Sequence, residues 1–514
     1  MTFYLVEKFA TRKDQNHKPR FPGPTGLTVS VWFLGLGIAL LSGCAVGPNY
    51  HPPKVNTPPT FRDQTSSGTN SLADLPWWTI YRDETLQNLI REAFTNNYDL
   101  RVAVSRVEQA RTLVAQARST FFPQINYDGG AARGRQSFLG NPIPSGEQRG
   151  NPNTSSFLAD FNAVWEVDLF GRLRRGLEQV NAQFLATEEA RRGVTLTLLS
   201  DVAQAYFELL ELDQLVKIAK RTTNSFGETL RLFEERLHGG VASKLETSRA
   251  EAALASAAAS IPELNRQIML KENQINVLLG RNPGPVARTA TLLGQTMPPE
   301  VPAGLPSELL QRRPDILEAE QNLRAANATI GLAIGQFFPR IGLTAIYGGV
   351  STDLSLLTSG GASVWSVAAN VAGPVFQGGR YYAQYRQAKA AWEEARLRYQ
   401  QTALNAFQEV SNALISRQEF ARIRVELTRS VRAYVEAVDV SIDRYRAGKA
   451  SYYEVLEAQQ QLFPNENALA QTELNQLVVI VQLYKALGGG WEQPMDQAGQ
   501  FSTAKNANTS KSHE

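Results

Sequence analysis

The chain has 514 residues, of which 43% are hydrophobic, with a formal net charge of +3, one cysteine and four histidines. A single cysteine excludes an intrachain disulfide and a cysteine-cluster metal site, and the scattered histidines lack the spacing of a metal centre. We therefore expect no metal and no cofactor. A charge this small gives no reason to expect a nucleic acid as partner.

The first 43 residues have the form of a secretory signal, because a basic segment precedes an apolar run from Val31 to Leu40. That run is shorter than the roughly 20 residues that a membrane-spanning helix needs. It leads into Leu41-Ser42-Gly43-Cys44, which resembles a bacterial lipobox. An isolated cysteine is most often simply buried, but its position directly after the apolar run favours lipidation. The sequence predicts a signal peptide over 1–43 and a lipid-anchored chain that starts at Cys44.

Residues 44–84 form an N-terminal extension in which prolines recur from Pro48 to Pro59. Prolines stiffen a chain and cannot pair as a helix, so we expect an extended linker here. No later stretch reaches 18 apolar residues, and no transmembrane helix is predicted.

The remaining sequence contains an internal duplication. The segment 121–125 recurs 216 residues later as 337–341, and matches at a separation of 208 hold from Arg172 with Arg380 to Gly280 with Gly488. Separations that persist over such lengths indicate two copies of one unit. We predict repeats over 85–281 and 306–491, a linker over 282–305 between them, and a disordered polar tail over 492–514.

Each repeat contains long stretches with helical spacing. These tracts are 85–119, 172–238, 243–279, 314–336, 380–446 and 451–487. At 1.5 Å per residue, a helix over 172–238 would be about 100 Å long. Helices of this length imply coiled-coil packing rather than a globular core.

Two predicted β-hairpins, 123–169 and 339–375, lie between the helices. In 157–168 the odd positions are apolar, from Phe157 to Val167, and most even positions are polar. Segments of about ten residues with this alternation and with aromatic residues near their ends are typical of membrane barrel strands. A soluble two-layer sheet alternates equally well, so the pattern alone leaves both open. Residues 132–156 and 348–362, rich in Gly, Pro, Ser and Asn, are predicted to be long loops.

The strand count bears on assembly. Two hairpins give four strands per chain, whereas the smallest closed bacterial membrane barrel has about eight. An open sheet edge in lipid costs several kcal/mol for each unpaired backbone group. If the strands span a membrane, the barrel must therefore be shared, with eight strands in a dimer or twelve in a trimer.

A set of motifs resembles the TolC family of outer membrane channels, in the lipoprotein (NodT-type) branch that serves tripartite efflux pumps. The motifs are Leu41-Ser42-Gly43-Cys44, Gly47-Pro48-Asn49-Tyr50, Trp77-Trp78, Asp99-Leu100, Asp168-Leu169-Phe170-Gly171-Arg172, Gly240 to Glu246, Arg312-Arg313-Pro314-Asp315-Ile316, Gly448 to Glu457 and Leu487-Gly488-Gly489-Gly490-Trp491. The similarity covers about residues 41–491. It implies a mainly α fold with membrane β-structure, in which a homotrimer forms a twelve-strand barrel continued by a long α-helical coiled-coil barrel. It also implies a place in outer membrane lipid, with a periplasmic adaptor (membrane fusion) protein and an inner membrane pump as partners.

The resemblance further implies functional residues at the two hairpin tips. Those expected to meet the adaptor are Gly240, Val241, Ala242, Ser243, Arg446, Gly448, Lys449, Ala450 and Ser451. The same residues could serve only to build turns, since glycine tolerates positive φ and Ser243 and Ser451 stand at capping-box spacing from Glu246 and Glu454.

A periplasmic gate is implied just past the second tip, at Tyr453 and Glu457, where the family more often has Leu and Asp. A ring of three Tyr453 side chains would block the pore sterically, and a ring of three Glu457 would favour cations. Helical spacing alone fits a solvated helix face equally well.

An enzyme is not predicted. The only Gly-Lys pair, Gly448-Lys449, is followed by Ala450, so no phosphate-binding loop is present, and no nucleophile elbow occurs. We predict a passive exit duct for small molecules such as drugs. Two alternatives remain at this point: a TolC-like exit channel for type I protein secretion, which lipidation disfavours, and a structural periplasmic coiled-coil adaptor, which would need no membrane strands.

Overall fold

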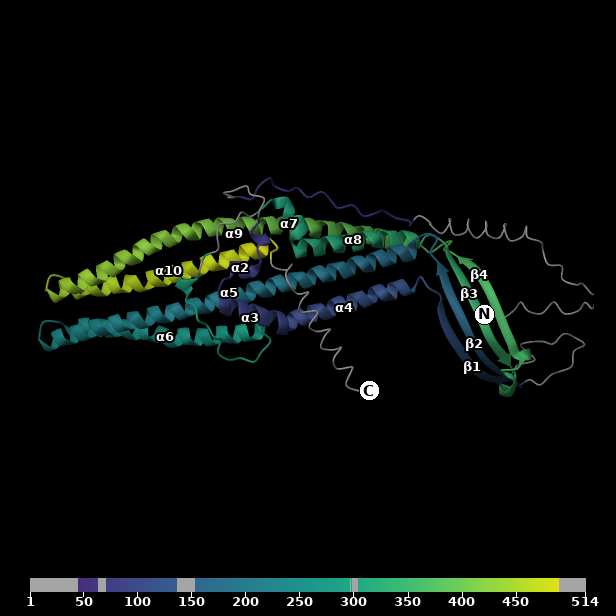
Figure 1. The fold of residues 1–514 in the computed structure, drawn as a ribbon, viewed down its shortest axis with the longest axis horizontal. Coiled ribbons are helices and arrows are strands. Elements are labelled where there is room, and N and C mark those ends of the chain that lie inside the picture. The colour runs from purple at the N-terminus through teal and green to yellow at the C-terminus, as the bar shows by residue number, and fades with distance from the viewer. Residues whose placement is uncertain (1–44, 63–70, 136–152, 296, 298–303, 490–514) are drawn as a thin grey trace, which may run out of the picture.

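The computed structural model describes residues 45–62, 71–135, 153–295, 297 and 304–489. This part of the protein is elongated, with a β-sheet at one end and helices that extend to the other (Figure 1). The predicted signal peptide, Cys44 and the tail over 492–514 lie outside the described residues. The helices are α2 (Trp77–Ile80), α3 (Glu84–Asn96), α4 (Tyr98–Ser119), α5 (Arg172–His238), α6 (Lys244–Leu278), α7 (Pro306–Arg312), α8 (Pro314–Gly335), α9 (Arg380–Arg446) and α10 (Tyr452–Ala486). The strands are β1 (Gln124–Arg135), β2 (Asn153–Val167), β3 (Arg340–Ser351) and β4 (Ser363–Ala372), and short 3-10 turns are η1 (Leu72–Asp74), η2 (Leu292–Gly294), η3 (Leu354–Leu356) and η4 (Gly360–Ala362).

The two repeats consist of matching elements, as the duplication predicts. The helices α5 and α9 have 67 residues each and begin 208 residues apart, and each is followed by a helix of 35 residues, α6 or α10. Both long helices begin directly after a glycine in the left-handed region, Gly171 at φ 76° and Gly379 at φ 81°. Because glycine reaches this conformation without steric cost, the chain turns sharply from strand connection into helix at both points.

Two features differ from the sequence-based predictions. The tract predicted as one helix over 85–119 is divided into α3 and α4 at Asn97, whose side-chain oxygen accepts a hydrogen bond from the amide of Leu100 (2.9 Å). Its side-chain nitrogen donates to the carbonyl of Leu278 (2.9 Å), which fixes the break against α6. The predicted loops are too long, because β1 continues to Arg135 and β3 to Ser351, and β2 already begins at Asn153. All three extensions are held by backbone pairing between these strands.

The four strands form one antiparallel sheet in the order β1-β2-β3-β4, so the two hairpins join through β2 and β3. The register places Tyr127 opposite Phe161, Phe161 opposite Tyr347, and Tyr347 opposite Trp365. All four side chains are exposed. One face of the sheet therefore carries a continuous aromatic row across all four strands.

The opposite face of the sheet is polar where β1 and β2 meet. Asn126 lies opposite Asn162, and the side-chain nitrogen of Asn162 donates to a carboxylate oxygen of Asp128 (2.5 Å). Asp160, opposite Asp128, belongs to the same face. The alternation read from the sequence thus becomes two faces of opposite character.

The main hydrophobic core lies along the middle of the helical part, where α5 packs against α3, α4, α6, α8 and α10. Two tyrosines at its centre are fully buried and hydrogen-bonded. The hydroxyl of Tyr206 donates to Asp83 (2.7 Å), and that of Tyr484 donates to the carbonyl of Leu75 (2.9 Å). The first bond fastens α5, and the second fastens α10, to the segment that precedes the first repeat.

Among the described helices, none combines the length and the apolarity that crossing a bilayer requires.

Candidate functional site

The far ends of the helix pairs are closed by two equivalent turns, one between α5 and α6 and one between α9 and α10 (Figure 1). Gly240 has φ 73° and Gly448 has φ 70°. In both turns the residue after the glycine donates its amide to a carbonyl five residues earlier: Val241 to Arg236 (2.9 Å) and Lys449 to Arg444 (2.8 Å). The two tips therefore have the same backbone hydrogen-bond pattern, which is that of a glycine-terminated helix.

The residues predicted to meet an adaptor all lie at this end of the molecule. They are exposed, apart from the half-buried Ala242 and Ala450. At the second tip Ser451 and Glu454 form the capping box that their spacing indicates. At the first tip Ser243 makes no capping hydrogen bond, and Glu246 instead accepts a hydrogen bond from the hydroxyl of Tyr445 (3.4 Å) in the other hairpin.

That contact belongs to a cluster, here named the tip clasp, which joins the two hairpins. The guanidinium of Arg236 lies over the ring of Tyr445 and donates to the carbonyl of Arg446 (3.2 Å). Tyr445 also packs against Phe233, with ring centroids 5.0 Å apart. Burial raises the pKa of the Tyr445 hydroxyl, so it remains a neutral donor.

A second contact strengthens the clasp, because Arg249 of α6 donates to the hydroxyl of Tyr452 in α10 (2.8 Å).

The tip clasp was not predicted from the sequence. The available signal was a difference between the repeats, since Tyr445 stands 208 residues after Leu237, an aromatic residue where the first copy has an aliphatic one.

The predicted gate residues lie on α10, just beyond the second tip. Tyr453 is 60% exposed, and Glu457 is also exposed. Between them Val455 and Leu456 are buried against the other helices. A spacing of four residues places Tyr453 and Glu457 on one helix face, and this face points away from the packed hairpins.

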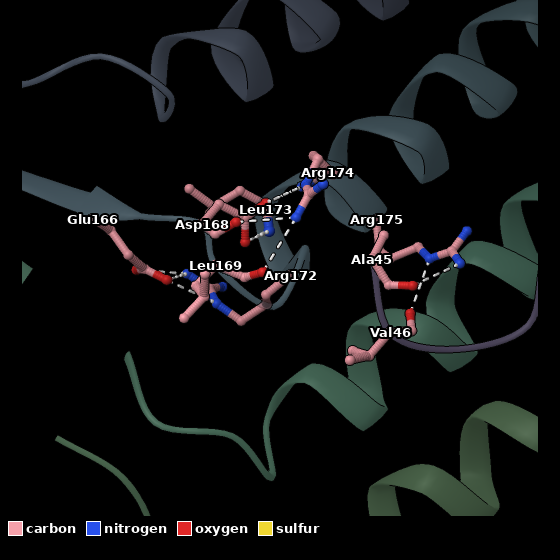
Figure 2. A network of polar contacts seen from close by, with 9 residues as sticks. All are labelled: Ala45, Val46, Glu166, Asp168, Leu169, Arg172, Leu173, Arg174 and Arg175. Carbon is pink, nitrogen blue, oxygen red and sulfur yellow. Dashed lines mark hydrogen bonds and ion pairs between the residues drawn. The ribbon is translucent and has the colours of Figure 1, made fainter. Parts of the chain in front are cut away.

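A second polar site lies at the opposite end of α5, where the sheet joins the helices (Figure 2). Arg172 donates through one nitrogen to both carboxylate oxygens of Glu166, at 2.9 and 2.8 Å. Asp168 caps the helix by accepting from the amides of Leu173 (3.1 Å) and Arg174 (2.9 Å). These bonds connect the end of β2 to the first turn of α5, so the direction of the helix is fixed relative to the sheet.

The same junction joins the two repeats. The rings of Phe170 and Phe338 are stacked, with centroids 4.7 Å apart.

Within the described ranges, no group of three or more His, Cys, Asp or Glu side chains has an arrangement that could hold a metal ion.

Comparison with known proteins identifies the family. The family model described as "Outer membrane efflux protein" matches residues 89–281 and 305–489. The probable efflux pump outer membrane protein TtgC of Pseudomonas putida is 35% identical over 481 residues, which cover 92% of this chain and 98% of the relative. The cation efflux system protein CusC of Escherichia coli is 32% identical over 460 residues, covering 88% and 97%.

Solved structures agree with these matches. The outer-membrane channel OprN superposes with a TM-score of 0.81 at 31% identity, over 88% of this chain and 100% of that one. The open state of the Neisseria gonorrhoeae MtrE outer membrane channel gives a TM-score of 0.78 at 31% identity, over 87% and 99%. The predicted resemblance to TolC-type channels is thereby confirmed. The chain belongs to the outer membrane efflux protein family, whose members are transport components and not enzymes.

Proposed function

We propose that three copies of this chain form a twelve-strand barrel in the outer membrane, which continues into a helical duct across the periplasm. One observation carries this proposal: the sheet has only four strands and leads directly into the 67-residue helices. Within the described residues, the two outer strands, β1 and β4, each pair with a neighbour on one side only. Open edges cannot face lipid. Pairing of β4 with β1 of the next copy would remove them.

The two faces of the sheet support this orientation. The aromatic row formed by Tyr127, Phe161, Tyr347 and Trp365 suits the lipid-facing side of a barrel, because the outer face of a membrane barrel is mainly apolar. The polar face with Asp128 and Asn162 suits a water-filled lumen. Helices of this length would extend the lumen by about 100 Å.

We propose that the duct is the exit component of a tripartite pump for small molecules, with a periplasmic adaptor and an inner membrane pump as partners. Relatives are named as outer membrane proteins of antibiotic and solvent efflux pumps, and another as a protein of a cation efflux system. These names favour small-molecule efflux over type I protein secretion. As a passive duct, the channel depends on the pump for energy and for the choice of substrate.

Susceptibility testing examines this function. A strain that lacks the gene should be hypersensitive to pump substrates, and a plasmid copy of the wild-type gene should restore resistance. Gly448→Pro at the second tip should insert and assemble but not restore resistance, because proline cannot adopt φ 70°. Gly360→Pro, at the first position of η4 near the other end of the molecule, is the matched control and should restore resistance. Full resistance with Gly448→Pro would remove the proposed docking role of the tips.

We also propose that Cys44 carries the lipid that anchors the chain. The lipobox-like Leu41-Ser42-Gly43-Cys44 supports this. The mass of the N-terminal peptide of the purified protein tests it directly, because acylation adds the mass of the fatty acids to a peptide that begins at Cys44. A peptide from an unprocessed or unmodified cysteine would contradict the anchor.

A further inference from the structure

Residues 45–50, here named the strap, are bound to both repeats at the junction of sheet and helices. The amide of Val46 donates to the carbonyl of Phe170 (3.1 Å), just before α5. Further along, Asn327 of α8 donates to the carbonyl of Pro48 (2.9 Å), and the hydroxyl of Tyr50 donates to Glu320 of α8 (3.2 Å). The segment predicted as an extended linker is therefore fixed to the protein from its first described residues.

Arg175 of α5 is the centre of this attachment (Figure 2). Only 4% of the residue is exposed. Its Nε donates to the carbonyl of Val46 (3.0 Å), and one terminal nitrogen donates to the carbonyl of Gly47 (3.1 Å) and to the side chain of Asn49 (3.0 Å). The other terminal nitrogen pairs with Glu178 (2.8 Å). If the strap left, a buried cation would lose most of its acceptors, which is strongly unfavourable.

The fit between the strap and the helices requires two glycines. Gly47 has φ +97°, and a Cβ there would collide with the Cα of Gly331 in α8. A Cβ on Gly331 would in turn lie 2.9 Å from the side-chain carbons of Arg175. The strap, α8 and the Arg175 side chain thus pack in direct contact, with no room for another side chain at either glycine.

The second repeat provides an internal comparison. Its junction makes the same turn into a long helix through Gly379, the counterpart of Gly171. The residue that corresponds to Arg175 at a separation of 208 is Ala383, and the counterpart of Asp168 is Phe376, which is 85% exposed. A buried arginine is therefore not needed to turn the chain from strand connection into helix, and Arg175 has another role.

We propose that Arg175 is a positioning residue for the membrane anchor: by holding the strap it fixes the point at which the N-terminal lipid leaves the protein. This inference rests on the proposed lipidation of Cys44. Ala45, the residue that follows the proposed lipid site, lies against Gly171 at the start of α5, so the described chain begins at the junction of sheet and helices. If the chain from Cys44 to Ser71 were instead a flexible coil, the distance between the lipid anchor and Ser71 would vary by roughly 30 Å. The clamp directs the acyl chains into the leaflet beside the barrel wall.

Hydrogen exchange of the purified, assembled channel tests the clamp. Two variants weaken the contacts of the strap: Arg175→Met removes the guanidinium, and Gly47→Ala changes only the strap. The matched control is Arg172→Met, which removes a neighbouring arginine that pairs with Glu166. We expect amides of the strap to exchange at least tenfold faster in Arg175→Met and in Gly47→Ala than in the wild type and in Arg172→Met. The conductance of Arg175→Met and of Gly47→Ala in planar bilayers should equal that of the wild type, because the duct itself stays intact.

The outcomes separate the possible roles. Full protection of the strap in both Arg175→Met and Gly47→Ala would overturn the clamp. Loss of the assembled channel in both variants would show that Arg175 supports the fold rather than the anchor, which also overturns the proposal. If Arg175→Met alone fails to assemble, Gly47→Ala decides, because it leaves α5 unchanged. A third outcome separates this inference from the proposed function. If the strap amides are protected from exchange but the N-terminal peptide carries no acyl groups, the lipid anchor is rejected, whereas the contacts of the strap are retained.

Discussion

The guanidinium carbon of Arg236 lies 4.3 Å from the centre of the Tyr445 ring, and this contact joins the tip of the first hairpin to that of the second. A cation over an aromatic ring contributes about 0.5–2 kcal/mol, depending on how far it is desolvated. The Tyr445 ring adds its packing on Phe233. The clasp therefore holds the two hairpins of one chain together at the end of the molecule that bears the predicted gate.

Removing the clasp should loosen that end. We expect Tyr445→Ala to increase the conductance of the isolated channel in planar bilayers, because the second hairpin is then free to move from the first. Tyr445→Phe keeps the ring over which Arg236 lies and loses the hydroxyl with its 3.4 Å hydrogen bond to Glu246, so its effect should be much smaller. Equal conductance of Tyr445→Ala and the wild type would show that the clasp does not restrain the tips.

The gate proposal makes a separate prediction for α10. We expect the double variant Tyr453→Ala, Glu457→Ala to be leakier than the wild type, since it removes both the steric ring and the acidic ring. Tyr382→Ala is the matched control, because Tyr382 is also 60% exposed but lies in the first turn of α9, near the sheet. Unchanged single-channel conductance and ion selectivity in the double variant would reject this gate.

The orientation of the sheet can be tested at two neighbouring residues of β2. Phe161 belongs to the aromatic row, and Asn162 belongs to the polar face. Arginine on the lipid-facing side of a barrel costs about 2–4 kcal/mol near the middle of the membrane. We therefore expect Phe161→Arg to lower the amount of assembled protein in the outer membrane fraction, and Asn162→Arg to accumulate close to the wild-type level. The reverse order would mean that the aromatic row faces the lumen.

Glu211, in the middle of α5, predicts a pH dependence of stability. Burial first, and then the negative charge of nearby Glu208, raise the pKa of its carboxyl to about 7, although Lys271 opposes the shift. The folded state thus binds the proton more tightly than the unfolded state, so stability is greatest below the ordinary pKa of about 4.5. It then falls as the pH rises towards 7.

Replacing the Glu211 carboxyl should remove this loss of stability at high pH. Glu211→Gln is expected to raise the temperature at which the assembled channel dissociates at pH 8, with little difference from the wild type near pH 4.5. The gain is at most on the order of 3 kcal/mol per chain. Glu228→Gln, at an exposed position of the same helix, should show no such pH-dependent gain. A Glu211→Gln protein no more stable than the wild type at pH 8 would contradict the argument.

The long helices and the four strands could be predicted because local signals and the duplication agree. Glycine at 171 and 379 marks the start of both 67-residue helices, and no proline interrupts either one. The ends of the strands could not be predicted in the same way. Residues 132–135 and 348–351 contain three glycines and read as loop, but pairing with β2 keeps them in the sheet.

The contacts that join distant parts of the chain were beyond sequence reasoning. Arg236 and Tyr445 are separated by more than 200 residues. Arg444 repeats Arg236 at a separation of 208, but the counterpart of Tyr445 is Leu237, so the duplication does not point to the pair. Arg175 is one of several arginines in α5, and only the folded structure shows that its partners are backbone carbonyls of the strap. Sequence periodicity locates helix faces, whereas the partner of a buried polar group depends on how the helices pack.

The number of chains in the functional particle tests the account most directly. The purified protein in detergent should have the mass of three chains, dissociate to single chains on heating, and conduct ions when it is inserted into a planar bilayer. A stable particle with the mass of one chain and no conductance would show that four strands can close by themselves, which contradicts the shared barrel.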